Sequence, residues 1–302
     1  MKVDVNIISK NREPYLYGLL LSLKYQTHKN FDVYILDDGS QMPLQNNHYL
    51  MTLIQRLKFE GHRVELIRQD RSQGIVKSRQ KLVEHTLENG TGEAILRLDD
   101  DTFLEDNYIE NLVNVLEMGY DIASGITPPA GNPLMERDID FVSPVINRCV
   151  LDNEGNFIIN SDDCGHSYYN NKVLLADHFR SAALIKKEVH KVIAYEEVFT
   201  NCGFREEQFF SFRAILAGFK IGVDTGAIMW HCLAPSGGDR KQEYQNLALE
   251  NQKMLNRYTR KWYKENGDFI EKYHIRNKVI QTEKQKMSNL QKSSNLIFTR
   301  EL

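Results

Sequence analysis

The sequence predicts an α/β fold in which a mostly parallel sheet carries helices on both faces, followed by a C-terminal helical tail. Apolar runs of about five residues alternate with helical patterns over the first 126 residues. A polar cluster follows each of the first four apolar runs. Repeated strand–helix units form parallel sheets with right-handed crossovers, and such sheets bind ligands beyond the carboxyl ends of their strands.

The expected elements follow one another in regular order. Strands are expected at 3–8, 31–36, 63–68, 94–98 and 120–126, with helices at 14–26, 44–61, 75–90 and 107–118. Pro14 suits the first turn of its helix, and Gly61 suits the end of the next. After residue 126 the pattern loosens into a strand and helix over 179–193, a helix over 203–219, strands at 220–224 and 227–231, and a helical tail from about Gln242.

The composition bounds the class of protein. With 41% hydrophobic residues the chain can bury a core, which excludes wholesale disorder. The four cysteines form no CxxC pair, which argues against a zinc knuckle or a disulfide framework. No signal peptide and no apolar run of about 18 residues is evident, so a cytoplasmic location is expected.

Three adjacent aspartates, Asp99, Asp100 and Asp101, directly follow the apolar run 94–98. Neighbouring carboxylates repel one another, so a positive partner is expected. Alternate residues of an extended turn point the same way, which lets Asp99 and Asp101 address one ligand. Mn²⁺ and Mg²⁺ prefer such oxygen ligands together with phosphate oxygens, and the alternative is an acidic loop that caps the next helix.

Three further positions have both a functional and a structural interpretation. Asp37 or Asp38 can accept hydrogen bonds from a nucleobase or a ribose, or can simply form an Asp-Gly turn. Glu206 and Glu207 open a helix, where the dipole favours carboxylates, and one of them could serve as a general base. A lone histidine such as His231 is more often structural, although imidazole is a good ligand for Mn²⁺.

Four stretches occur in a recognisable order: IISKNREPYLYGLLLSLKYQTHKNFDVYILDDGS (7–40), QDRSQGIVKSRQKL (69–82), AILRLDDDTFLEDNYIENL (94–112) and GFREEQFFSFRAILAGFKIG (203–222). Together they resemble the family 2 glycosyltransferases, which have the Rossmann-like GT-A fold. The resemblance covers roughly residues 3–232. It implies one GT-A domain with a nucleotide-sugar-binding half over 1–126 and an acceptor-binding and catalytic half over 127–235, followed by a loop and basic helical tail over 236–302.

The resemblance also implies roles for individual residues. Asp38, or its neighbour Asp37, would recognise the base, and Asp99 and Asp101 would form the metal-binding DxD pair. His231 would be a third metal ligand. Glu206 and Glu207 match the acceptor-side Glu-Asp pair, with glutamate replacing aspartate. The residues implied at the donor site are Ser9, Asn11, Arg12, Asp37, Asp38, Gly74, Arg79, Asp99 and Asp100.

These roles predict an inverting glycosyltransferase that depends on Mn²⁺ or Mg²⁺, favours a UDP-sugar donor and uses Glu207 as general base. Two alternatives are a non-catalytic nucleotide-sugar-binding module and a nucleotidyltransferase. The latter is disfavoured because the loop after the first strand, SKNREP, has no glycine. The acceptor is left open among saccharide, lipid-linked, protein and modified-DNA substrates, as is self-association.

The C-terminal tail is basic although the whole chain carries a net charge of −3. From Lys253 onwards there are 12 Lys and Arg residues against 5 Asp and Glu, a local +7. Basic and aromatic residues alternate over 257–280, as in helices that lie on anionic lipid or contact nucleic acid. The third interpretation is an ordinary helical cap packed on the catalytic domain through Trp262 and Phe269.

Overall fold

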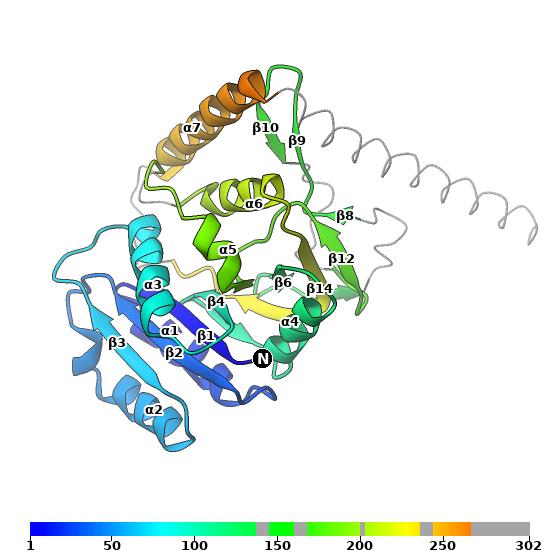
Figure 1. Cartoon of the computed structure of the whole chain (residues 1–302). Coiled ribbons are helices and arrows are strands. Elements are labelled where there is room, and N and C mark those ends of the chain that lie inside the picture. Colours follow the sequence, from blue (N-terminus) through cyan, green and yellow to red (C-terminus); the bar gives the residue numbers. More distant parts are fainter. Residues whose placement is uncertain (137–144, 160–167, 200–202, 236–243, 267–302) are drawn as a thin grey trace, which may run out of the picture.

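The structure, a computed structural model, describes residues 1–136, 145–159, 168–199, 203–235 and 244–266. A large mixed sheet forms its centre, with helices packed around it (Figure 1). The first half contains β1 (Val3–Ser9), α1 (Glu13–Lys24), β2 (Phe31–Asp37), α2 (His48–Phe59), β3 (Val64–Arg68), α3 (Ile75–Asn89), β4 (Ala94–Asp99), β5 (Thr102–Leu104), α4 (Tyr108–Glu117) and β6 (Ile122–Ile126). This half confirms the alternation expected from the sequence.

The second half is less regular. It contains the short strands β7 (Met135–Glu136), β8 (Val145–Ile146), β9 (Cys149–Leu151), β10 (Phe157–Ile159), β11 (Tyr168–Tyr169), β12 (Val173–Ala176) and β13 (Ala183–Lys186). These are followed by α5 (Lys187–Val192), α6 (Glu206–Leu216), β14 (Ile221–His231) and α7 (Tyr244–Glu265). The expected tail is described only through α7, and its remainder from residue 267 lies outside the described residues.

The main sheet has the order β3-β2-β1-β4-β13-β6-β14-β12-β8, and β5 pairs with β14. β1, β2, β3 and β4 are parallel, as predicted. β13 runs antiparallel to both β4 and β6, between which it lies, so the sheet is mixed. The second half of the chain therefore supplies a central strand to the sheet of the first half.

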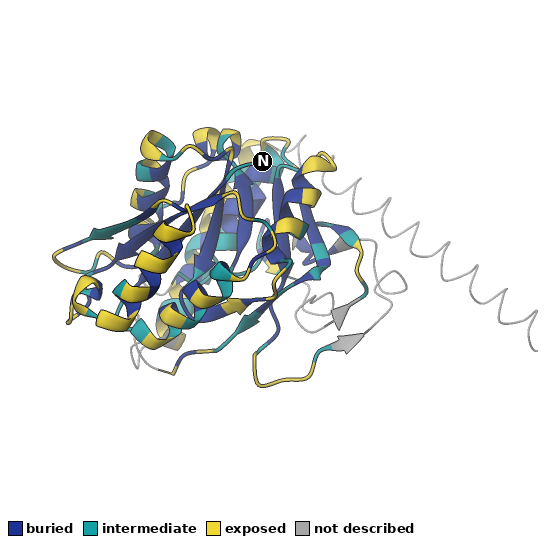
Figure 2. Cartoon of the chain, turned by 90° about the horizontal axis from the view of Figure 1, so that it is seen from below, coloured by how far each residue is buried: buried dark blue, intermediate teal, exposed yellow. Residues whose placement is uncertain are grey.

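Both faces of the sheet are buried under helices, which explains why its strands read as continuous apolar runs. On β2, Val33 and Ile35 join the core under α1 and α2, whereas Tyr34 and Leu36 pack with Leu82 of α3. A second core, which includes Phe209, Phe210 and Phe212, lies between the sheet and α6. The strands form the buried centre in Figure 2, and exposed residues lie mainly on the outer sides of the helices.

Two elements differ from the sequence-based expectation for local reasons. The expected helix over 44–61 is a short 3₁₀ turn followed by α2, because Asn47 caps α2 by accepting a hydrogen bond from the Leu50 amide at 3.0 Å. The two strands expected at 220–224 and 227–231 form the single strand β14, with a register shift between Val223 and Ile228. Such an irregularity bends a strand without ending it.

Candidate active site

The carboxyl ends of the first four strands meet at one edge of the sheet. Ser9 is aligned with Asp37, and Asp37 with Arg68, while Ile8 is aligned with Asp99. The polar clusters that follow these strands are therefore neighbours in space. This is the position at which parallel sheets bind ligands.

The loop after β1 connects two parts of this edge. Asn11 has a left-handed φ of 54°, its amide donates to Ser40 Oγ at 3.0 Å, and its side-chain oxygen accepts from the Gln41 amide at 2.7 Å. The Arg12 side chain instead contacts the aspartate cluster, and its guanidinium lies 3.0 Å from Asp100 and 3.5 Å from Asp101. The predicted first loop thus places a partly buried cation, Arg12, beside the aspartate cluster.

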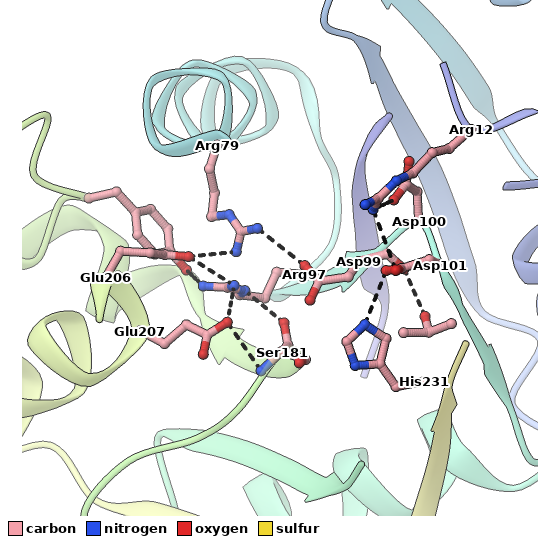
Figure 3. Close-up of polar contacts among 12 residues, drawn as sticks. Arg12, Arg79, Arg97, Asp99, Asp100, Asp101, Ser181, Glu206, Glu207 and His231 are labelled. Atoms are coloured by element: carbon pink, nitrogen blue, oxygen red, sulfur yellow. Dashed lines mark hydrogen bonds and ion pairs between the residues drawn. The ribbon is translucent and has the colours of Figure 1, made fainter. Parts of the chain in front are cut away.

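The three aspartates point to different partners (Figure 3). Asp99 lies 3.3 Å from Arg79, whereas Asp100 and Asp101 share Arg12. Asp101 also lies 3.3 Å from His231 Nε2. The expected arrangement of Asp99 and Asp101 around one ligand is thus not the one adopted here, and their joint role stays a prediction.

The partners give the aspartates different protonation properties. Burial raises the pKa of Asp100 to about 6 against the opposing charge of Arg12. Burial also acts to raise the pKa of Asp101, but the hydrogen bond and charge of His231, with Arg12, outweigh it and lower that pKa to about 2. Asp101 is therefore the member of the cluster that is most firmly ionised at neutral pH.

Asp101 and His231 are held together by backbone pairing. β14 runs antiparallel to β5, and His231 is aligned with Thr102, the residue after Asp101. The Asp101 carbonyl accepts from the Cys232 amide at 2.8 Å, and its carboxylate accepts from the Ala234 amide at 2.9 Å. Carboxylate and imidazole are suitable donors for Mn²⁺, and such an ion normally keeps waters or phosphate oxygens as further ligands. Within the described residues no group of three or more His, Cys, Asp or Glu side chains forms a complete metal site.

Asp37 and Asp38 are almost completely buried, and their carboxylates accept hydrogen bonds from the loops around them. Asp37 accepts from the Ser40 and Leu44 amides and pairs with Arg68. Asp38 accepts from Gln69, Ser72, Gln73 and Ser78, at distances of 2.7–2.9 Å. Both carboxylates therefore hold in place the loops that follow β2 and β3. Recognition of a base by Asp38 stays a prediction.

Gly74 and Arg79 begin α3 on the other side of the aspartates. Gly74 is the residue before the helix and has a φ of 86°, a conformation that favours glycine. Arg79 is buried, with one guanidinium nitrogen 3.3 Å from Asp99 and another 3.0 Å from Glu206. Arg79 thus connects the aspartate cluster to the predicted acceptor side.

Arg97 of β4 organises the two glutamates and was not singled out from the sequence. It lies 3.1 Å from Glu206 and 2.9 Å from Glu207, and donates to the Ser181 carbonyl at 3.1 Å. Its signal in the sequence was a lone charge inside the apolar strand AILRL, because a buried arginine needs buried partners. Ser181 had no such signal, since its φ of 55° is a property of the folded loop.

The two glutamates differ in exposure and in the partners of their carboxylate oxygens. Glu206 is 4% exposed and contacts both Arg79 and Arg97 through Oε1; burial raises its pKa to about 8 against the charge of Arg97. The side chain of Glu207 is 21% exposed, and its Oε1 accepts from Arg97 at 2.9 Å and from the Ser181 amide at 3.2 Å. Within the described part of the chain, Oε2 of Glu207 has no hydrogen-bond donor. One oxygen of Glu207 is anchored and the other is available to a ligand.

Sequence comparison agrees with this geometry. Residues 4–147, just under half of the 302 residues, match the sequence model of Glycosyl transferase family 2. This part of the chain is therefore similar to that family. No curated protein matches the sequence.

Solved structures similar to this chain have the GT-A fold. One is S. aureus TarS, with a TM-score of 0.52 and 16% identity over 78% of this chain and 37% of that chain. Another is GalNAc-T7 with UDP, GalNAc and Mn²⁺, with a TM-score of 0.56 and 13% identity over 76% and 44% of the two chains. A third is the mannosyltransferase PcManGT from Pyrobaculum calidifontis in complex with GDP-Man and Mn²⁺, with a TM-score of 0.55 and 14% identity over 83% and 62%.

This chain thus spans less than two thirds of the length of each of these three proteins. The likeness confirms the predicted GT-A fold. In addition, none of the helices in the described ranges is both long and apolar enough to cross a lipid bilayer.

Proposed function

We propose that this protein is an inverting glycosyltransferase that moves a sugar from a nucleoside diphosphate to an acceptor hydroxyl, with Glu207 as general base. The carrying observation is the half-anchored state of Glu207: Oε1 is fixed by Arg97 and by the Ser181 amide, while Oε2 has no donor among the described residues. A general base needs a fixed direction and a free lone pair within reach of the proton that it removes. Glu207 has both.

Glu206 fits a supporting role better than a catalytic one. It is almost completely buried, and the oxygen that contacts the protein lies against two arginines. Its contacts hold Arg97 and Arg79 in place, and Arg97 in turn directs Glu207. Glu206 is therefore a positioning residue, and Glu207 is the residue that would contact the acceptor.

The donor would bind along the edge formed by the ends of β1, β2 and β4. Arg12 is a partly buried cation in contact with Asp100 and Asp101 and would face the diphosphate, while Ser9 and Asn11 line the same loop. The loops fixed by Asp37 and Asp38 would surround the base, with Gly74 allowing a close approach. A UDP-sugar is the favoured donor, and the structures of GalNAc-T7 with UDP and of PcManGT with GDP-Man make both nucleotides worth testing.

A divalent cation, Mn²⁺ or Mg²⁺, fits the donor set of this edge. Asp101 and His231 would hold it, with Asp99 available if its contact to Arg79 opens, and the diphosphate would supply further oxygens. When bound, such an ion neutralises negative charge on the departing nucleoside diphosphate. The firmly ionised state of Asp101 at neutral pH suits this role.

The proposed reaction is a single displacement. Glu207 Oε2 takes the proton of the acceptor hydroxyl, whose oxygen forms a bond to the anomeric carbon. The bond from that carbon to the phosphate oxygen breaks with its electron pair, and the nucleoside diphosphate leaves. In Figure 3 Glu207 lies on the opposite side of Arg97 from Asp101 and His231, which suits attack from the face opposite the leaving group.

The test is a screen of UDP- and GDP-sugars with the full chain and Mn²⁺, in which nucleoside diphosphate release is measured and the anomeric proton of the product is assigned by NMR. An inverted product, lost in Glu207→Gln, is expected. A retained configuration contradicts the single displacement. Donor binding without release or hydrolysis of any sugar nucleotide would favour the non-catalytic binding module instead.

A further inference from the structure

The outer face of α7 carries a dense row of cations that the proposed reaction does not use. Five exposed basic residues recur at spacings of three, four and one along one side of the helix: Lys253, Arg257, Arg260, Lys261 and Lys264. Residues three and four apart share a helix face, so these charges form a single stripe about 16 Å long. With Asn256 they line a shallow hollow of about 580 Å³ that contains no carboxylate.

The stripe is only weakly neutralised by the rest of the protein. Arg260 lies 3.6 Å from the exposed Glu154, and Lys261 lies 3.8 Å from Glu265. In the described ranges Lys253, Arg257 and Lys264 have no ion-pair partner. Lys253 and Arg257 lie one helical turn apart and repel each other, and an anionic partner would remove that repulsion.

The opposite face of α7 packs against the rest of the domain. Leu255 and Thr259 are buried, and the Thr259 hydroxyl donates to the Gly155 carbonyl at 2.7 Å. Trp262 packs edge-on against Phe212 of α6, with ring centroids 5.8 Å apart. Leu255 and Trp262 are therefore used in packing, which confirms the cap interpretation for Trp262, while the five cations lie on the outside. Phe269 lies outside the described residues.

We propose that the basic face of α7 (Lys253, Arg257, Arg260, Lys261 and Lys264) docks the protein on a lipid surface rich in anionic headgroups. The cations lie along the outer side of a helix whose other side is packed on the domain, so they can contact several headgroups of a flat surface at once. Trp262, one of the aromatic rings that could stack on single-stranded bases, is packed against Phe212, and Tyr258 contacts Phe209, although it is half-exposed. Basic residues near an anionic membrane each strengthen binding about five-fold.

Docking through α7 would orient the catalytic domain. α7 packs on α6, the helix that begins with Glu206 and Glu207, through Phe212 and through a contact of Phe209 with Tyr258 at 5.0 Å. In Figure 1 α7 lies on the α6 side of the molecule, away from β3 and α2. The surface would therefore face the acceptor-side half of the protein, and the inference does not depend on the donor or on activity.

The test is sedimentation of the full chain with phosphatidylcholine vesicles that contain or lack phosphatidylglycerol. The variant Lys253→Gln/Arg257→Gln/Lys264→Gln is compared with Arg56→Gln/Lys58→Gln/Lys191→Gln, which removes the same charge from exposed positions on α2 and α5. The wild-type chain and the control should bind only the anionic vesicles, and the α7 variant should bind roughly 100-fold more weakly. Far-UV circular dichroism checks that α7 is still helical, and Lys253→Arg/Lys264→Arg should bind as wild type.

Several results would overturn the proposal. Absence of binding, equal binding to both kinds of vesicle, or equal losses in the α7 and control variants would each do so. A 30-base-pair DNA duplex at the same salt concentration provides the competing partner, and tighter binding to the duplex than to the vesicles would assign the face to nucleic acid instead.

Discussion

Glu207→Gln should remove catalysis while leaving the site assembled. The substitution keeps the length of the side chain and an oxygen that can accept from Arg97 and from the Ser181 amide, the two bonds that now fix Oε1. It removes the lone pair and charge that would take the acceptor proton. The matched control is Glu206→Gln, the same change at the adjacent position, where the side chain is buried against Arg79 and Arg97.

The expected magnitudes separate the two glutamates. Loss of a positioned general base typically lowers the rate by about 10²–10⁴-fold, or roughly 3–5 kcal/mol in the activation free energy. Replacing a charge-assisted hydrogen bond by a neutral one at Arg97 costs about 1 kcal/mol of folding free energy, so the Glu207 variant should stay folded. Glu206→Gln acts only through the positions of Arg97 and Arg79, so a smaller loss in kcat than in Glu207→Gln is expected.

The assay is the initial rate of nucleoside diphosphate release at saturating donor, combined with calorimetric titration of UDP and Mn²⁺ into each variant. Glu207→Gln should lose kcat and keep its nucleotide affinity. A larger loss of kcat in Glu206→Gln than in Glu207→Gln would refute the assignment of roles. Weaker nucleotide binding in Glu207→Gln would show that Glu207 serves the donor rather than the acceptor.

Three further predictions follow from the site. Asp101→Ala should abolish Mn²⁺-linked nucleotide affinity in calorimetry, while unchanged affinity would remove Asp101 from the proposed cation site. The control is Lys58→Ala, at an exposed position on α2. Because burial raises the folded-state pKa of Glu206 to about 8 from an ordinary value of 4.5, its stabilising contribution is present below the unfolded pKa and is lost as pH rises towards 8. Glu206→Gln should therefore gain in unfolding free energy relative to wild type between pH 5 and 8, and a difference that does not vary with pH contradicts the shift. Gly39→Ala should destabilise the chain by about 1–3 kcal/mol in chemical denaturation. Gly39 has a φ of 70°, and an added Cβ would lie 2.5 Å from the Ser72 amide nitrogen. The control Gly18→Ala should not destabilise the chain, because no atom lies within 4 Å of the added Cβ.

The sequence predicted what local pattern controls. Periodicity gave the strands and helices of the first half, and the polar residues after each strand indicated the correct edge of the sheet. It could not reveal that β13 lies between β4 and β6, because strand order depends on tertiary packing. A short apolar segment such as ALIK does not specify which edge it joins.

In the site, too, local motifs identified some residues, while the roles of others depend on tertiary packing. Asp101 and His231 were identified as a pair through family motifs, and backbone pairing of β5 with β14 brings them together. The role of Arg97 depends on contacts across more than 100 residues, to Glu206 and Glu207, which no local spacing encodes. The hydrogen bonds that loop residues donate to Asp38 likewise depend on the tertiary fold.

The central place of β13 means that the two halves of this chain cannot be separated at residue 126. A fragment that ends there would lack the strand that joins β4 to β6 and would expose two unsatisfied edges in the middle of its sheet. The complementary fragment would carry β13 with neither neighbour. Each piece expressed alone is expected to aggregate, and co-expression should recover soluble material by strand complementation.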